Sequence, residues 1–145
     1  MFVVDTNVLV YAADERAPEH TRCRALLLGW RAEILPWHLT WSIVYEFVRV
    51  VTHPRVFVRP WSAPQAWTFI DALLAASSLK VLVATEGHAE VARTVMNEVP
   101  DLRGNLLHDA HIAILMKEHG IHRIYTRDTD FHRFPFVEPV DPLAV

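Results

Sequence analysis

The chain has 145 residues, of which 52% are hydrophobic and 21% are charged, a composition that fits one globular domain and excludes a disordered protein. The net charge of −3 excludes a generally basic nucleic-acid-binding coat, and the single cysteine excludes an internal disulfide framework or a cysteine-rich zinc site. No apolar run reaches the roughly 18 residues that a membrane span needs, and Asp5 interrupts the N-terminal apolar segment, so we expect neither membrane contact nor a signal peptide. We expect residues 1–145 to form a single domain in the cytoplasm.

The first expected elements are a strand and a helix. Residues 2–4 form a short apolar run that ends at Asp5, which is typical of a buried parallel strand. A helix is expected from about residue 18 to residue 31, because Pro18 suits a first helical turn and apolar residues recur behind it at helical spacing.

A second helix is expected over residues 41–52, with Thr40 as its N-cap. Glu46 lies at the border of the apolar stripe of this helix, next to Ile43 and Val50. A carboxylate at that border can face a cleft beside the core. A solvated side chain on the helix flank is the ordinary alternative.

The second half of the chain is expected to alternate between helices and strands. The expected helices cover residues 66–76, 86–98 and 105–119, and the expected strands cover residues 80–84, 123–126 and 136–138. The segment Ser62 to Gln65 has the pattern of a capping box ahead of the first of these helices. Gly120 is placed to end the last one as its C′ residue.

This order of elements predicts a three-layer α/β domain, with a mainly parallel central sheet flanked by helices. Right-handed crossovers then bring the carboxyl ends of the strands to one edge of the sheet. Asp5 and Asp128 directly follow expected strands, which places them at this edge. Asp109 lies in the first turns of an expected helix, and a helix that follows a strand starts at the same edge. We therefore expect these three acids to meet, at the edge where open parallel sheets bind ligands.

Each acid also has a structural explanation of its own. Asp5 can cap a helix, Asp109 can complement a helix dipole, and Asp128 and Asp130 can be turn residues. Their joint placement favours a site for Mg²⁺ or Mn²⁺, which prefer carboxylate oxygen and retain waters. We expect Asp5, Asp109 and Asp128 to bind the metal, and Glu46 to complete the coordination or to orient the attacking water. Such a site performs phosphoryl chemistry.

Polar neighbours of these acids are candidate auxiliary residues. Thr126 or Thr6 could donate a hydrogen bond to the scissile phosphate. Asn7 follows Asp5 by two positions, and Asn105 shares a helix face with Asp109. The expected auxiliary set is Thr6, Asn7, Asn105, Thr126 and Asp130.

The segments that carry these acids resemble one known family. The segment DTNVLV, the helix with a central Glu46, the segment NLLHDAHIAIL and the segment TRDTDF are similar to those of the PIN-domain family, and more narrowly of its VapC-type toxins. The resemblance extends from residue 2 to about residue 143. It implies an endoribonuclease dependent on Mg²⁺ or Mn²⁺, with its four acids at Asp5, Glu46, Asp109 and Asp128.

The resemblance also implies partners. VapC-type toxins form homodimers, and an antitoxin protein inhibits them by placing its C-terminal segment in the toxin groove. The pair Asp128 and Asp130 gives two candidates for the fourth acid, and we prefer Asp128 because it lies nearer the end of a strand.

Other functions remain open on the sequence alone. A catalytically silent PIN-like module that binds RNA or a protein would tend to lack one of the four acids, and none is missing. A phosphatase that forms an aspartyl-phosphate normally has a second Asp two residues after the first, where this chain has Asn7. A nucleotide-binding fold is disfavoured, because neither G-x-x-x-x-G-K nor G-x-G-x-x-G occurs.

Aromatic residues at expected element ends form the last candidate feature. Trp37, Trp41 and Trp61 lie at such ends, whereas core packing explains most tryptophans of the first half. If exposed, they would mark a face for a protein partner or a stacking surface for unpaired bases. The protein partner is the preferred interpretation.

Overall fold

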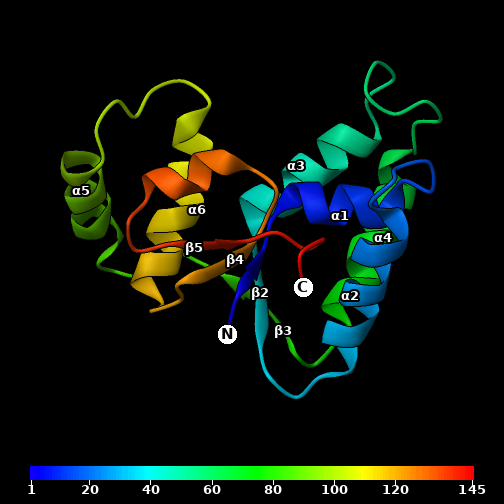
Figure 1. Ribbon diagram of the computed structural model, residues 1–145, viewed down its shortest axis with the longest axis horizontal. Helices are drawn as coiled ribbons and strands as arrows, with labels where there is room; N and C mark the ends of the chain where they lie inside the picture. Colours follow the sequence, from blue (N-terminus) through cyan, green and yellow to red (C-terminus); the bar gives the residue numbers. More distant parts are fainter.

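The computed structural model describes residues 1–145, which form a five-stranded parallel sheet with helices on both sides (Figure 1). The strands are β1 (Val3–Val4), β2 (Trp37–Thr40), β3 (Leu79–Leu82), β4 (Arg123–Tyr125) and β5 (Glu138–Val140). The helices are α1 (Thr6–Ala13), α2 (His20–Ala32), α3 (Trp41–Val51), α4 (Ala63–Leu74), α5 (His88–Glu98), α6 (Leu106–Glu118) and the 3₁₀ segment η1 (Thr129–Arg133). The predicted α/β class is confirmed.

The order of the strands places a switch point beside β1. The order is β3-β2-β1-β4-β5, so the chain builds outward from β1 to β3 and then returns to the other side of β1 for β4 and β5. In the β1–β4 pair, Val3 lies beside Ile124 and Val4 beside Tyr125. Ligands of open parallel sheets bind outside the carboxyl ends of the strands at such a switch point. The residues that follow β1 and β4 are therefore placed to build a site.

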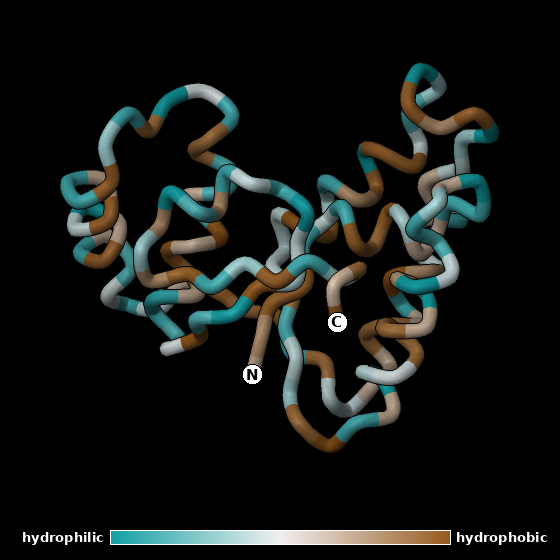
Figure 2. The backbone as a smooth tube through the Cα atoms, viewed as in Figure 1, coloured by the Kyte–Doolittle hydropathy of each residue, from teal (hydrophilic) through white to brown (hydrophobic).

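The helices cover both faces of the sheet. Figure 1 shows α1 to α4 gathered on one side and α5 and α6 on the other. The 33 buried hydrophobic residues form one core cluster that includes both residues of β1. Figure 2 shows hydrophobic stretches running through the central strands. No helix combines the length and the apolarity that crossing a membrane requires.

Several local signals in the sequence act as predicted. The hydroxyl of Thr40 caps α3 by accepting a hydrogen bond from the backbone N–H of Ile43, at 3.2 Å. Ser62 and Gln65 form a reciprocal capping box at the start of α4. Gly120 follows α6 with a φ of +65°, a left-handed conformation that glycine adopts without a steric penalty.

Three elements were not predicted, namely β2, α1 and the short 3₁₀ segment η1. β2 has only four residues, and its strand conformation depends on pairing with β1 and β3 on its two sides. α1 begins directly after Asp5, in a segment rich in β-branched residues whose own helix propensity is modest. Because Trp37 lies inside β2 and is fully buried, the prediction that it could be exposed at an element end is wrong.

Two further predictions need correction. The last strand is Glu138–Val140, and not residues 136–138, because it pairs with β4 in that register. α6 follows α5 and not a strand, so the premise used to place Asp109 at the sheet edge is wrong. Asp109 nevertheless lies in the first turn of α6 and reaches the same pocket as Asp5.

Candidate active site

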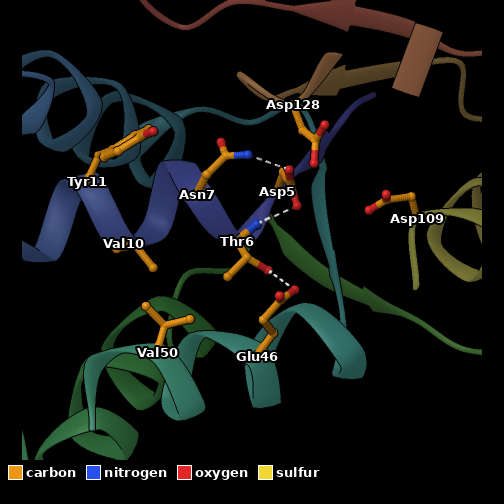
Figure 3. Close-up of a pocket in the computed structure, with 9 residues that line it drawn as sticks. All are labelled: Asp5, Thr6, Asn7, Val10, Tyr11, Glu46, Val50, Asp109 and Asp128. Carbon is orange, nitrogen blue, oxygen red and sulfur yellow. Dashed lines mark hydrogen bonds between the residues drawn. The ribbon is translucent and has the colours of Figure 1, made fainter. Parts of the chain in front are cut away.

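A pocket of about 290 Å³ lies at the carboxyl ends of β1 and β4. Figure 3 shows four carboxylates directed toward its interior from four separate segments. Asp5 follows β1, Glu46 lies on α3, Asp109 on α6, and Asp128 precedes η1. The structure thus brings together all four acids that the sequence singles out.

Asp5 is the most deeply buried of the four and the most firmly held. Only 6% of the residue is exposed. Its Oδ1 accepts a hydrogen bond from the backbone N–H of Thr6 at 2.7 Å, which makes Asp5 the N-cap of α1. Its Oδ2 accepts from the side-chain amide of Asn7 and from the hydroxyl of Thr126, both at 2.6 Å. Asp5 is therefore a helix cap and a pocket residue at once, and the two interpretations do not compete.

Thr126 and Asn7 connect the β1–α1 junction to the segment after β4. The hydroxyl oxygen of Thr126 accepts hydrogen bonds from the amide of Asn7 at 3.0 Å and from the backbone N–H of Asp128 at 2.9 Å. The amide oxygen of Asn7 accepts from the backbone N–H of Arg127 at 3.3 Å. This network fixes the positions of Asp5 and Asp128 relative to one another.

Glu46 reaches the pocket from the edge of the buried face of α3. The residues around it on that helix, Ile43, Val44 and Phe47, are fully buried. Its Oε2 accepts a hydrogen bond from the hydroxyl of Thr6 at 3.1 Å, and its Oε1 lies 3.4 Å from the guanidinium of Arg49. The helical wheel therefore predicted its position correctly.

Asp109, Asp128 and Asp130 form a close group of carboxylates. One oxygen from each lies within 4.8 Å of the others, a spacing that a single cation can span. Asp128 Oδ1 accepts a hydrogen bond from the backbone N–H of Asp130 at 2.8 Å, and Asp130 lies 3.4 Å from Arg133. Asp109 accepts no hydrogen bond from the protein, so its charge lacks the compensation that Asp5 receives.

The electrostatics of the pocket favour a bound cation. Burial raises the pKa of Asp5 to about 6, against the opposing effect of its hydrogen bonds from Thr126 and Thr6. Burial, and next the charge of Asp128, raise the pKa of Asp109 to about 7. Carboxylates that resist ionisation in this way are stabilised when a cation neutralises them. Because every candidate ligand is an oxygen atom, the donor set fits Mg²⁺ or Mn²⁺ and not a soft metal.

The candidate auxiliary residues divide into two groups. Thr6, Asn7 and Thr126 contact the acids of the pocket, as described above. Asn105 and Asp130 line an adjoining groove and do not line the pocket itself.

Sequence reasoning missed three residues of the pocket wall. They are Val10, Tyr11 and Val50. The first two lie on α1, which was not predicted. Asp5 could have indicated α1, because an Asp at the end of a strand is a common helix N-cap. The turns of the helix that follows such a cap extend along the pocket.

Comparisons with known proteins identify related sequences. The model of the PIN domain family matches residues 2–137. Ribonuclease VapC43 of Mycobacterium tuberculosis is 39% identical over 134 residues, which are 92% of this chain and 90% of the relative. Ribonuclease VapC48 of the same species is 31% identical over 140 residues, which are 97% of this chain and 96% of the relative.

Solved structures support the same fold. VapC20 of Mycobacterium tuberculosis, described as a Sarcin-Ricin loop cleaving toxin, superposes with a TM-score of 0.68 at 20% identity and covers 95% of this chain and 98% of its own. VapBC2 from Rickettsia felis, bound to a DNA fragment from their promoter, gives a TM-score of 0.65 at 17% identity, with 96% of each chain covered. At these identities the likeness establishes the fold alone.

Proposed function

Because this chain belongs to the PIN-domain family, we propose that it is a metal-dependent endoribonuclease that cleaves RNA phosphodiester bonds, the toxin of a type II toxin–antitoxin pair. The observation that carries the proposal is the convergence of Asp5, Glu46, Asp109 and Asp128 on one pocket. Its relatives named as VapC ribonucleases match over nearly the whole chain, which supports the same activity.

We assign the metal site to the acids of the pocket. Asp5, Asp109 and Asp128 would hold Mg²⁺ or Mn²⁺, and Asp130 adds a carboxylate within reach of the latter two. When bound, the ion lowers the pKa of a coordinated water and offsets negative charge on the phosphoryl group. Glu46 is placed at the pocket wall to orient the attacking water.

We assign Thr126, Asn7 and Thr6 to positioning. The hydroxyl of Thr126 donates to Asp5, and the hydroxyl of Thr6 donates to Glu46. Since a hydroxyl has one proton, neither group has a second one for a phosphate in this arrangement. The expected donation to the scissile phosphate therefore gives way to a role in holding the two carboxylates.

We further propose a cognate antitoxin protein as the partner, a homodimer as the assembly, and the cytoplasm as the site of action. Support for the antitoxin comes from neighbours solved as VapBC assemblies, from Rickettsia felis and Salmonella typhimurium. Co-expression with a small DNA-binding protein encoded next to this chain, followed by size-exclusion chromatography with light scattering, tests both the partner and the dimer.

The direct test of the activity is RNA cleavage by the purified protein. Cleavage should stop in EDTA and return with Mg²⁺ or Mn²⁺, and Asp5→Asn should abolish it while the circular dichroism spectrum stays native. Sequencing the RNA fragments from wild-type and Asp5→Asn digests distinguishes cleavage by this protein from cleavage by a contaminating nuclease. If Asp5→Asn cuts RNA at the wild-type rate, the assigned site is wrong. If the wild-type protein binds RNA without cutting it, the silent binding module is the better description.

A further inference from the structure

A second hollow, a groove of about 810 Å³, continues from the acidic pocket between α3 and α6. It shares Glu46, Asp109 and Asp128 with the pocket, so the two form one continuous depression. Each helix lines it with residues spaced i, i+3, i+4 and i+7, which is a single helix face. These residues are Ser42, Tyr45, Glu46 and Arg49 on the α3 side, and Asn105, His108, Asp109 and Ile112 on the α6 side.

The α3 wall of this groove carries an exposed aromatic ring. Tyr45 is 64% exposed, whereas Ile43 and Phe47 on the same helix are fully buried. Its ring centroid lies 6.0 Å from that of Trp67 on α4, at an interplanar angle of 47°. The neighbouring indole supports the ring from one side, while the rest of its surface remains open to a ligand. A ring held in this way loses little conformational freedom when a ligand stacks on it.

One turn further along α3, Arg49 supplies the one permanent positive charge among the residues that line the groove. Its guanidinium lies 3.4 Å from Glu46 in a pair whose side chains are 64% and 43% exposed. Exposed pairs of this kind are weak, so the guanidinium can exchange this contact for a phosphate at little cost. Arginine binds phosphate oxygens through two parallel N–H donors.

We propose that this groove holds an unpaired RNA strand beside the bond to be cut, with one base stacked on Tyr45 and one backbone phosphate bound by Arg49. The inference rests on the proposed function, because a phosphate cleaved at the four acids must have neighbours, and the continuous groove receives them. Bases inside a duplex are already stacked on one another and are not free to stack on a side chain, whereas unpaired bases can. The exposed ring of Tyr45 therefore favours single-stranded segments, whereas the phosphate contact of Arg49 adds affinity without selecting them.

Binding measurements test this assignment separately from cleavage. The probe is a short, fluorescein-labelled RNA that the wild-type protein cuts, measured by anisotropy in Ca²⁺, a hard cation with the same preference for oxygen ligands. Tyr45→Ala should raise the dissociation constant roughly 5- to 150-fold, the range of one base–aromatic stack. Tyr45→Phe keeps the ring and should bind like wild type. The same strand annealed to its complement should bind more weakly and should not respond to Tyr45→Ala.

An RNA series with one abasic position locates the stacked base. In the wild-type protein, one abasic position should weaken binding by about the factor seen for Tyr45→Ala. In Tyr45→Ala itself, that position should have no further effect, because the stacking partner is already missing.

A second experiment, on Arg49, tests the phosphate contact without relying on Tyr45. Arg49→Gln should reduce the slope of log dissociation constant against log salt by about 0.7, the value for one phosphate contact on a single strand. The matched control is Arg93→Gln, an equal change in charge at an exposed position on α5, outside the groove. The control should leave the slope unchanged.

The outcomes separate this inference from the proposed function. If the wild-type protein cleaves RNA and neither Tyr45→Ala nor Arg49→Gln changes RNA binding, the groove assignment is wrong and the nuclease stands. If the wild-type protein neither binds nor cleaves RNA, the proposed function itself fails. If Tyr45→Ala binds RNA normally but no longer binds the co-expressed antitoxin, the groove is a protein surface and the RNA assignment is overturned.

Discussion

Replacing Asp109 by Asn should make the metal-free protein more stable while abolishing RNA cleavage. Asp109 accepts no hydrogen bond and lies close to the carboxylates of Asp128 and Asp130. Asn has the same shape, removes the charge, and its amide can donate to a neighbouring carboxylate. Most point substitutions lower the stability of a protein. An increase on replacing Asp109 would therefore indicate repulsion among the carboxylates of the pocket.

The magnitude follows from the raised pKa of Asp109. Burial and the neighbouring acids raise that pKa from 3.8 to about 7. Fully counted, this rise in the pKa corresponds to a cost of roughly 4 kcal/mol for holding the ionised carboxylate in the folded protein above pH 7. Because Asp109 is only half-buried, solvent screens much of the interaction, and about 1–2 kcal/mol is a realistic gain for Asp109→Asn. For a chain of this length the gain corresponds to a rise in Tm of about 3–7 °C.

The difference should depend on pH in a defined direction. The folded state holds the proton of Asp109 more tightly than the unfolded state does, so it is the ionised form that destabilises the fold. The cost is fully present above pH 7, shrinks as the pH falls, and is lost only below the unfolded-state pKa of 3.8, where both states are protonated. Thermal melts in EDTA at pH 8 and at pH 4.5 should therefore show a clearly larger gap between wild type and Asp109→Asn at the higher pH than at the lower.

A matched control separates this local effect from a change in net charge. Asp71→Asn removes one negative charge from an exposed position on α4 and should change stability by no more than about 0.5 kcal/mol. If Asp109→Asn melts below wild type at pH 8, or if its advantage is the same at both pH values, ionised Asp109 does not destabilise the fold.

Three further predictions concern the same pocket. Thr126→Val removes the 2.6 Å hydrogen bond to Asp5 and should lower kcat or Mn²⁺ affinity roughly 10- to 100-fold, while Thr126→Ser, which keeps the hydroxyl, should restore most of the loss. Asp128→Asn should reduce kcat more than Asp130→Asn, because Asp128 lines the pocket and Asp130 lies in the groove beside Arg133; equal losses would count against the preference for Asp128. Mn²⁺ binding followed by calorimetry should release protons between pH 6 and 7 and should strengthen as the pH rises, because acids whose pKa values are about 6 and about 7 must ionise to bind the metal; constant affinity from pH 5.5 to 8 would contradict this.

Much of the site could be predicted from the sequence, because its acids lie at positions with a clear physical signature. Asp5 ends a buried apolar run, and Glu46 interrupts the border of an amphipathic helix. Such positions are defined by local periodicity, which a single sequence contains. The hydrogen bonds among Asp5, Asn7 and Thr126 could not be predicted, because they join residues up to 121 positions apart and depend on the register of β1 against β4.

The elements that were missed have a common cause. β2 has four residues, too few to establish a period, and pairing with its two neighbours determines its conformation. α1 opens with residues of modest helix propensity, and its start depends on the cap that Asp5 provides. The groove requires the relative placement of α3 and α6, which meet across the pocket although about 60 positions separate Tyr45 from Asn105. Tertiary packing fixes all of these features, and local sequence preference does not.

The convergence of four segments also explains how the fold can tolerate repulsion in its pocket. The carboxylates come from β1, α3, α6 and the segment before η1, so the cation site exists only when these elements have packed together. An unfolded chain offers no such site, and an ion that binds only the folded chain stabilises it as a whole. At 100 times its dissociation constant, the ion adds about 2.7 kcal/mol, which exceeds the roughly 1–2 kcal/mol that ionised Asp109 costs. Wild-type protein should therefore melt below Asp109→Asn in EDTA and above it in saturating Mn²⁺. Only a cation that binds the assembled carboxylates can reverse that order.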